Sequence, residues 1–240
     1  MLVLAKPKLV ARLLASDFPS ENPRTQTRNF YINVMKQIDT IIFDLGGVLI
    51  DWNPEYVFLD AFNGDRKKMQ WFFETICTSD WNENQDAGYP LAKATQDLVE
   101  KFPDYEHYIK LFYGDWEKML GGAIDGTVKI LKNLIALKKY KVVALTNWSN
   151  ETFPIAQKRF NFLQWFDGIV VSGDEKTRKP FKEIYNITLE RFNIIPENSI
   201  FIDDNLRNIE AANTLGINGI HFKNPEALIQ QLKTFNINVS

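Results

Sequence analysis

The chain has 240 residues, more than one domain of modal size, so we expect one large domain or a core with an insertion. Its composition, 45% hydrophobic and 24% charged, is that of a globular protein with a packed core. A formal net charge of −2 leaves no strongly basic footprint, and nucleic acid is therefore not expected as the main partner. No apolar run approaches the ~20 residues of a membrane span, so no membrane partner is expected either.

The cysteine and histidine content limits the redox and zinc chemistry that the chain can perform. Cys77 is the only cysteine, which excludes an internal disulfide. His107 and His221 are the only histidines, which leaves little for a zinc site. We expect Cys77 to be buried and inert, and the protein to be cytoplasmic, where thiols stay reduced.

The first 34 residues differ in character from the rest. Lys6, Lys8 and Arg12 come before any acidic residue, and a basic, acid-poor start is typical of a targeting segment. The alternative is a flexible extension over residues 1–34, ahead of Met35, which directly precedes the first predicted strand. We favour the extension, and Met35 is then a candidate natural start.

Regular strands and helices are predicted from residue 38 onward. The apolar run 38–45 is stopped by two glycines and predicts a buried strand. A helical stripe within 128–138 leads directly into a second apolar strand over 141–147. Three further strands are predicted over 167–173, 199–204 and 219–222, the last after a helix that Gly216 ends. Strands that alternate with helices predict an α/β fold with a parallel sheet covered on both faces.

Polar side chains stand where these predicted strands end. In such sheets ligands bind outside the carboxyl ends of the strands, which all lie at one edge. Four strands close on polar residues, and this convergence predicts a site there. The residues are Asp44, Thr146, Asn147, Ser172, Asp203 and Asp204.

The segment between the first two core strands has no β-type run. Aromatic clusters alternate with charged residues there, and Pro54, Pro90 and Pro103 stand where helices begin or break. We therefore predict a helical insertion over residues 52–122, within a core made of residues 35–51 and 123–240.

Four short motifs stand in chain order: FDLGGVL with Asp44, ALTN with Thr146, RKP with Lys179, and IDDNLRN with Asp203, Asp204 and Asn208. Together, in this order and on strand ends, they resemble the haloacid dehalogenase superfamily over about residues 36–222. The resemblance implies a doubly wound, Rossmann-like core with a helical cap inserted after the first motif. It also implies a phosphatase that acts on a small phosphorylated metabolite through an aspartyl-phosphate.

The residue types fit that chemistry. Asp44 can attack phosphorus as a carboxylate nucleophile, and with Asp203 and Asp204 it forms an oxygen-rich cluster suited to Mg²⁺. The resemblance adds the backbone carbonyl of Gly46 as a metal ligand.

The phosphate-binding groups also follow from the resemblance. Thr146 and Asn147 would bind the phosphate, and Lys179 would supply positive charge to it and to Asp44. The catalytic residues are then Asp44, Thr146 and Lys179. Without the resemblance, Thr146 would be a simple helix cap and Lys179 part of a solvated charged run.

The first motif departs from the family pattern at Gly46. Most phosphatases of the superfamily carry a second aspartate there as general acid and base, a function that contributes ~10²–10⁴-fold. A mutase is therefore disfavoured and substrates with good leaving groups are favoured. Asp51 is the nearest substitute acid, although a structural role at the cap entry suits it better. The motif is similar to that of bacterial glucose-1-phosphate phosphatases, which favours a sugar phosphate.

Two alternative functions remain. A 2-haloacid dehalogenase also uses an aspartate nucleophile, but it needs no metal and carries neutral residues in place of the acidic pair Asp203 and Asp204. A binding or regulatory module with little catalysis is the second alternative, and the missing acid is its support. The residues do not indicate an oligomeric state.

Two features bear on substrate recognition. Trp52, Trp81 and Trp148 are candidate platforms for a sugar ring, although packing in the core or at its boundary with the cap is favoured. The polar segment 78–88 is interpreted as a helix end followed by a loop that enters the pocket.

Overall fold

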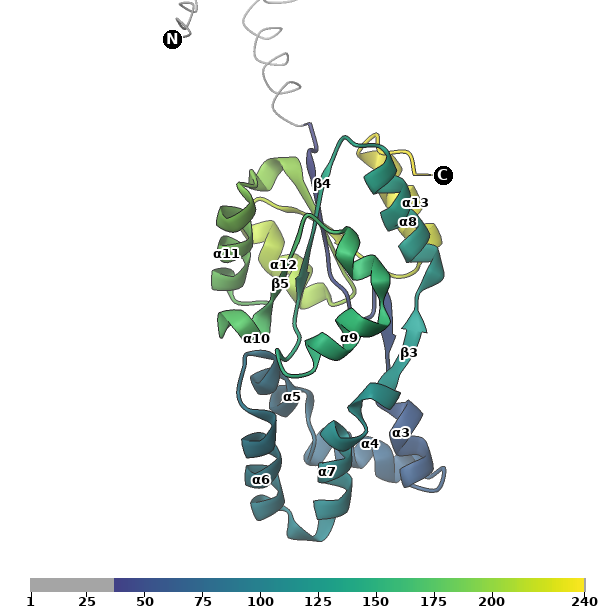
Figure 1. The fold of residues 1–240 in the computed structure, drawn as a ribbon, viewed down its shortest axis with the longest axis vertical. Helices are drawn as coiled ribbons and strands as arrows, with labels where there is room; N and C mark the ends of the chain where they lie inside the picture. The colour runs from purple at the N-terminus through teal and green to yellow at the C-terminus, as the bar shows by residue number, and fades with distance from the viewer. Residues whose placement is uncertain (1–36, 240) are drawn as a thin grey trace, which may run out of the picture. The chain divides into compact units, whose positions relative to one another are not determined.

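A computed structural model describes residues 37–239 of the chain (Figure 1). The predicted extension over residues 1–34, and the candidate start at Met35, lie outside the described residues.

A five-stranded parallel sheet forms the centre of the fold. Its strands are β1 (Thr40–Phe43), β4 (Lys141–Thr146), β5 (Gly168–Val171), β6 (Ser199–Asp203) and β7 (Asn218–His221), in the order β5-β4-β1-β6-β7. Thr40 of the central strand is in register with Lys141 on one side and Ser199 on the other. β1 and β6 are buried along their whole length, as the continuous apolar runs predict.

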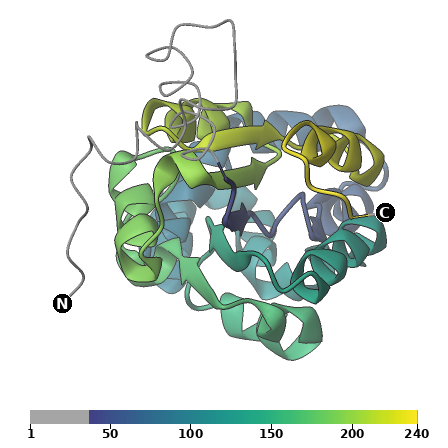
Figure 2. The same ribbon diagram turned by 90° about the horizontal axis from the view of Figure 1, so that it is seen from above.

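Helices cover both faces of this sheet (Figure 2). Helices α8 (Asp125–Ala136), α9 (Phe153–Arg159) and α13 (Pro225–Thr234) share one hydrophobic cluster with Ile41 and Phe43. Helices α11 (Lys182–Phe192) and α12 (Leu206–Thr214) share a second cluster with Ile42. Successive strand residues therefore point to opposite covered faces, which confirms the doubly wound α/β fold.

A two-stranded antiparallel ribbon leads out of the sheet and back. Strands β2 (Ile50–Trp52) and β3 (Leu120–Ala123) pair, with Ile50 opposite Ala123. The helices between them are α3 (Glu55–Ala61), α4 (Arg66–Thr75), α5 (Ser79–Asp86), α6 (Leu91–Lys101) and α7 (Glu106–Gly114). We call α3 to α7 the cap, and Figure 1 shows these helices together at one end of the sheet. The sequence-derived division, with a core of 35–51 plus 123–240 and a cap of 52–122, stays a prediction.

Two predicted elements differ from the structure. The strand predicted over 167–173 ends at Val171, because Ser172 begins the short helix α10 (Ser172–Glu175). The segment interpreted as a helix end and loop is helix α5, whose first turn is capped by the Thr78 side chain accepting from the Trp81 N–H at 3.2 Å. The sequence did not predict this helix because it is polar and has no apolar face; its only buried residue is Gln85.

The cap is packed around aromatic rings. Phe58 is fully buried, and its ring lies 5.5 Å from that of Phe72, 4.9 Å from that of Phe73 and 6.0 Å from that of Phe112. These rings belong to the same buried cluster as one face of the sheet. Offset and edge-on aromatic pairs add to the stability that area burial provides, so the cap helices have a rigid common core.

Across residues 37–239, the helices lack the combination of length and apolar character that crossing a bilayer requires.

Phe58→Ala is expected to lower the free energy of unfolding by about 3–5 kcal/mol, because it removes the ring around which the cap packs. Urea denaturation followed by circular dichroism measures this loss. Phe181→Ala is the matched control: Phe181 is 54% exposed, contacts the Arg178 guanidinium, and should lose at most about 1 kcal/mol. A loss at position 58 no larger than that of the control would contradict a packed cap.

Candidate active site

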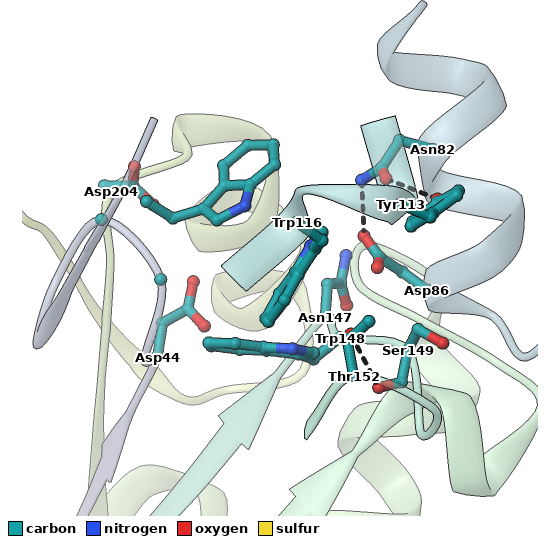
Figure 3. Close-up of a pocket in the computed structure, with 13 residues that line it drawn as sticks. Asp44, Asn82, Asp86, Tyr113, Trp116, Asn147, Trp148, Ser149, Thr152 and Asp204 are labelled. Atoms are coloured by element: carbon teal, nitrogen blue, oxygen red, sulfur yellow. Dashed lines mark hydrogen bonds between the residues drawn. The ribbon is translucent and has the colours of Figure 1, made fainter. Parts of the chain in front are cut away.

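A cavity of about 240 Å³ lies where the cap meets the carboxyl ends of β1 and β4 (Figure 3). Core and cap residues both line it: Asp44, Gly46, Gly47, Trp52, Asn82, Asp86, Tyr113, Trp116, Asn147, Trp148, Ser149, Thr152 and Asp204. The parallel sheet thus places its ligand-binding edge against the cap, as such folds do.

Asp44 lies directly after β1, at the floor of this cavity, and is 7% exposed. Its Oδ1 accepts from the Leu45 N–H at 2.7 Å, and its Oδ2 lies 2.9 Å from the Lys179 Nζ. Burial raises the pKa of Asp44, the Lys179 charge lowers it, and Asp203 and Asp204 raise it again, so that it ends well above its ordinary value. A cation bound in the cavity would lower this pKa and favour the ionised form of Asp44.

Lys179 is fully buried between two carboxylates. Its Nζ lies 2.6 Å from the Asp203 Oδ2 as well as 2.9 Å from Asp44. Burial lowers its pKa, but Asp203 and Asp44 outweigh that effect, and the pKa ends above its ordinary value. The amine therefore stays charged. Asn147 fixes its backbone, since Oδ1 accepts from the Lys179 N–H at 2.8 Å and Nδ2 donates to the Lys179 carbonyl at 3.0 Å.

The two acidic residues at the end of β6, Asp203 and Asp204, lie in different environments. Asp203 is fully buried, and its oxygens accept from Lys179, from the Asn205 N–H at 2.7 Å and from the Asn208 Nδ2 at 3.1 Å. Asp204 faces the cavity. Burial and then the Asp203 charge raise the pKa of Asp204, and Lys179 opposes them more weakly.

The three carboxylates form a group that fits a hard divalent cation. One oxygen each of Asp44, Asp203 and Asp204 lies within 4.8 Å of the others. Asp44 and Asp204 line the cavity, whereas Asp203 already accepts from Lys179, Asn205 and Asn208, and its role as a metal ligand stays a prediction. Oxygen-only donors of this kind suit Mg²⁺. Gly47 permits the arrangement, because at its φ of +71° a Cβ would stand 2.3 Å from the Asp204 Oδ2.

Gly46, the position where the family pattern carries an acid, is sterically open. It lines the cavity, and an added Cβ would meet no atom within 4 Å. Asp51, the substitute acid suggested by the sequence, accepts from the Tyr56 hydroxyl at 2.5 Å and does not line the cavity. The structure therefore places Asp51 at the cap entry, away from Asp44.

The remaining predicted site residues are placed as follows. Thr146 ends β4, is buried, and does not line the cavity. The Asn147 side chain lines the cavity but holds the Lys179 backbone with both of its polar atoms. Their proposed contacts with a phosphate stay predictions.

The structure adds lining residues that the sequence interpretation missed. Asn82 and Asp86 stand four positions apart on α5, Tyr113 lies on α7, Trp116 follows that helix, and Thr152 precedes α9. The spacing of Asn82 and Asp86 would have indicated a shared helix face if residues 79–86 had been predicted as helical. Tyr113, Trp116 and Thr152 carry no comparable signal.

Two of the three tryptophans considered as platforms for a sugar ring line the cavity, and one does not. Trp52 and Trp148 line the cavity, and Trp148 packs edge-on against Trp116 with ring centroids 5.5 Å apart. Trp81 does not line it and packs against Phe112 and Tyr113 within the cap.

The cap is tied to the core beside Lys179. Glu83 of α5 forms ion pairs with Arg178, at 2.6 Å, and with Arg207 of α12. The Ser172 hydroxyl donates to the Asp86 carbonyl at 2.5 Å and accepts from the Trp148 N–H at 2.9 Å. These contacts hold α5 over the cavity, which limits the access of water to Asp44.

Comparison with known proteins agrees with this geometry. Residues 41–222 match the sequence profile of haloacid dehalogenase-like hydrolases. The chain belongs to this family.

Two curated relatives of this hydrolase are phosphatases by name. A phosphorylated carbohydrates phosphatase of Thermotoga maritima is 23% identical over 191 residues, 77% of this chain and 84% of the relative. A sesquiterpene phosphatase of Aspergillus oryzae is 28% identical over 201 residues, 80% of this chain and 93% of the relative. A haloacid dehalogenase family enzyme of Bacteroides thetaiotaomicron, solved as a magnesium complex, has a TM-score of 0.61 at 24% identity, covering 79% of this chain and 95% of that one. The last shows that the fold is the same.

Lys179→Met is expected to lower the free energy of unfolding by about 3–5 kcal/mol near pH 8 in metal-free buffer, since it leaves buried carboxylates without a counter-charge. The loss should shrink near pH 5. Without the lysine, the folded state keeps protons on the cluster that the unfolded chain releases above pH ~4, and stability then falls as pH rises.

Urea denaturation at both pH values, in EDTA, measures this difference between variant and wild type. Lys182→Met, at an exposed position in the same segment, is the control and should change stability by no more than about 0.5 kcal/mol. A loss at position 179 that is equal at both pH values would show that packing, not charge, is what the lysine provides.

Proposed function

We propose that the protein is a cytoplasmic, Mg²⁺-dependent phosphatase that hydrolyses a small phosphomonoester through an aspartyl-phosphate on Asp44. The observation that carries this proposal is the buried Lys179 charge shared by Asp44 and Asp203, next to Asp204 at the cavity floor. Such a site offers a nucleophile, a fixed positive charge and carboxylate ligands at one point, which phosphoryl transfer requires. The names of the two phosphatase relatives and the magnesium complex of the Bacteroides enzyme support it.

Each residue of the site has a part in this proposal. Asp44 attacks phosphorus, and Lys179 stabilises the charge on the phosphoryl oxygens and on Asp44. Asp44, Asp204 and the Gly46 carbonyl would hold Mg²⁺, while Asp203 fixes the lysine. Bound Mg²⁺ supplies charge neutralisation for the phosphate and for the crowded carboxylates. Thr146 and the amides that follow β4 orient the phosphate.

A sugar phosphate, such as a hexose 1-phosphate, is the substrate class that we propose. Trp52, Trp116 and Trp148 offer apolar faces for a ring. Asn82, Asp86, Ser149 and Thr152 add hydrogen-bonding groups to the same walls. A ring with hydroxyl groups at its edge matches this mixture, and the Thermotoga maritima relative is named for phosphorylated carbohydrates.

The acidic pair argues against a haloacid dehalogenase. Attack on carbon needs no cation, and Asp204 would then only add negative charge beside the Asp44 nucleophile and oppose its ionisation. Metal-dependent turnover would exclude the other alternative, a binding or regulatory module.

Asp44→Asn is expected to abolish hydrolysis of p-nitrophenyl phosphate, because the amide is no nucleophile for phosphorus. The assay compares wild type and variant in Mg²⁺ and in EDTA, and then tests the wild type on a panel of phosphorylated metabolites that includes hexose 1-phosphates and prenyl phosphates. Asp60→Asn, an exposed position on the cap, serves as the control and should keep full activity. Phosphatase activity that survives Asp44→Asn, or that needs no metal, would refute the proposal.

Mg²⁺ is expected to stabilise the folded protein, since the unfolded chain has no preformed carboxylate cluster. Saturation at 100 times the dissociation constant adds about 2.7 kcal/mol, seen as a rise in Tm in a thermal melt. Asp204→Asn should lose most of this rise, because it removes a carboxylate that faces the cavity. An equal rise in Asp204→Asn and wild type would place the ion elsewhere.

A further inference from the structure

The phosphatase proposed above lacks an obvious proton donor for the departing alcohol. Position 46 offers no side chain, and Asp51 is bonded to Tyr56 at the cap entry. Among the residues that line the cavity, the titratable ones are Asp44, Asp86, Tyr113 and Asp204. Asp44 and Asp204 serve as nucleophile and metal ligand in the proposed function. The Tyr113 hydroxyl donates to the Asn82 Oδ1 at 2.9 Å, and burial and the Asp86 charge raise its pKa far above neutrality.

On the basis of the proposed phosphatase function, we propose that Asp86 of the cap is the general acid and base of this site. Its carboxyl group would protonate the leaving oxygen in the first half-reaction and accept a proton from water in the second.

The position of Asp86 fits this task. Figure 3 shows Asp44 and Asp86 on opposite sides of the cavity, with Trp116 and Trp148 between them. In-line transfer places the leaving oxygen on the side of the phosphorus away from the nucleophile. A phosphate bound at Asp44 therefore directs its leaving oxygen toward the side that Asp86 occupies.

Asp86 is held in place by both parts of the protein. The Asn82 Nδ2 donates to its Oδ2 at 3.3 Å from the same helix, and Ser172 of the core donates to its backbone carbonyl at 2.5 Å. A general acid must be positioned as well as protonated, and these bonds fix the carboxyl group while it faces the cavity.

The charges around Asp86 set its protonation state. Burial, the largest effect, and the charge of Glu83 on its own helix raise the pKa of Asp86, whereas Arg178, a Ser149 backbone hydrogen bond and Lys179 lower it. The net pKa is about 7. The Tyr113 phenol faces it from α7, and Glu151 lies near that phenol. Glu83 is itself paired with Arg178 and Arg207. A carboxyl group that is half protonated near neutral pH can both donate and accept a proton.

The two steps balance as follows. Asp44 Oδ bonds to phosphorus while the bond from phosphorus to the leaving oxygen breaks, and the Asp86 proton passes to that oxygen to release the alcohol. The oxygen of a water molecule then bonds to the phosphorus of the aspartyl-phosphate while the bond from phosphorus to the Asp44 Oδ breaks, and the water gives a proton to the Asp86 carboxylate. Inorganic phosphate leaves, and both Asp44 and Asp86 return to their starting states.

The test is the dependence of kcat/KM on the leaving group, measured with 2,4-dinitrophenyl, p-nitrophenyl and phenyl phosphate. These esters have similar shapes but need increasing help from an acid in the order given. Asp86→Asn should lower kcat/KM for phenyl phosphate by ~10²–10⁴-fold. The loss factor for the dinitrophenyl ester should be at least tenfold smaller than that for phenyl phosphate. Asp86→Glu, which keeps a carboxyl group, should recover part of the loss on phenyl phosphate.

The pH profile gives a second readout. For wild type, kcat/KM with phenyl phosphate should fall as pH rises above about 7, because the protonated form of Asp86 is required. This decline should disappear in Asp86→Asn. Asp80→Asn, an exposed position on the same helix, is the control and should keep both the leaving-group dependence and the pH profile of wild type.

The outcomes separate this inference from the function on which it rests. An equal loss on all three esters, or an unchanged pH decline in Asp86→Asn, would show that Asp86 only positions the substrate and would overturn the inference alone. Absence of Mg²⁺-dependent turnover in wild type would overturn both. A Mg²⁺-induced rise in Tm that persists in Asp86→Asn excludes misfolding as the cause of its losses.

Discussion

The buried Lys179 ammonium group is the charge around which the core of this protein is arranged. A charge without solvent is stable only with close partners, and here Asp203 and Asp44 provide them at 2.6 Å and 2.9 Å. Neighbouring hydrogen bonds hold these charged groups in position: Asn147 fixes the lysine backbone, and Asn208 donates to Asp203. Because one positive charge serves several carboxylates, the site remains deficient in positive charge. That deficiency favours the binding of a cation.

The cap is connected to this charge network. Arg178 precedes Lys179 in the chain and pairs with Glu83 of the cap, which also pairs with Arg207. Any motion that lifts α5 would break both ion pairs and withdraw Asp86 from the cavity at the same time. Closure would therefore complete the site as well as exclude water, and substrate binding energy could drive it.

The elements and site residues that could be predicted from the sequence have a different physical basis from those that could not. The strands that lead to Asp44, Thr146 and Asp203 are short apolar runs buried on both faces. Their apolar composition and the glycine or polar residues that terminate them therefore identify them in the sequence. The proximity of Asp44 and Asp203 follows from the parallel pairing of β1 and β6, whereas Lys179 comes from the segment between α10 and α11. Helix α5 was missed because a cap helix between solvent and a polar cavity buries little apolar surface. Asp86 was missed with it, since cap-to-core contacts such as Ser172 to Asp86 span 86 residues and leave no local pattern.

The open space at Gly46 bears on how this site controls its reaction. An acid there would fit sterically, so its absence is not forced by packing. An acid fixed next to the nucleophile assists water whether the cap is open or closed. An acid carried by α5 assists proton transfer only when the cap is closed over a substrate that fills the cavity lined by Trp52, Trp116 and Trp148. Placing the acid on the cap thus couples catalysis to recognition of the whole substrate, and the small phosphate group alone would not suffice to assemble the site.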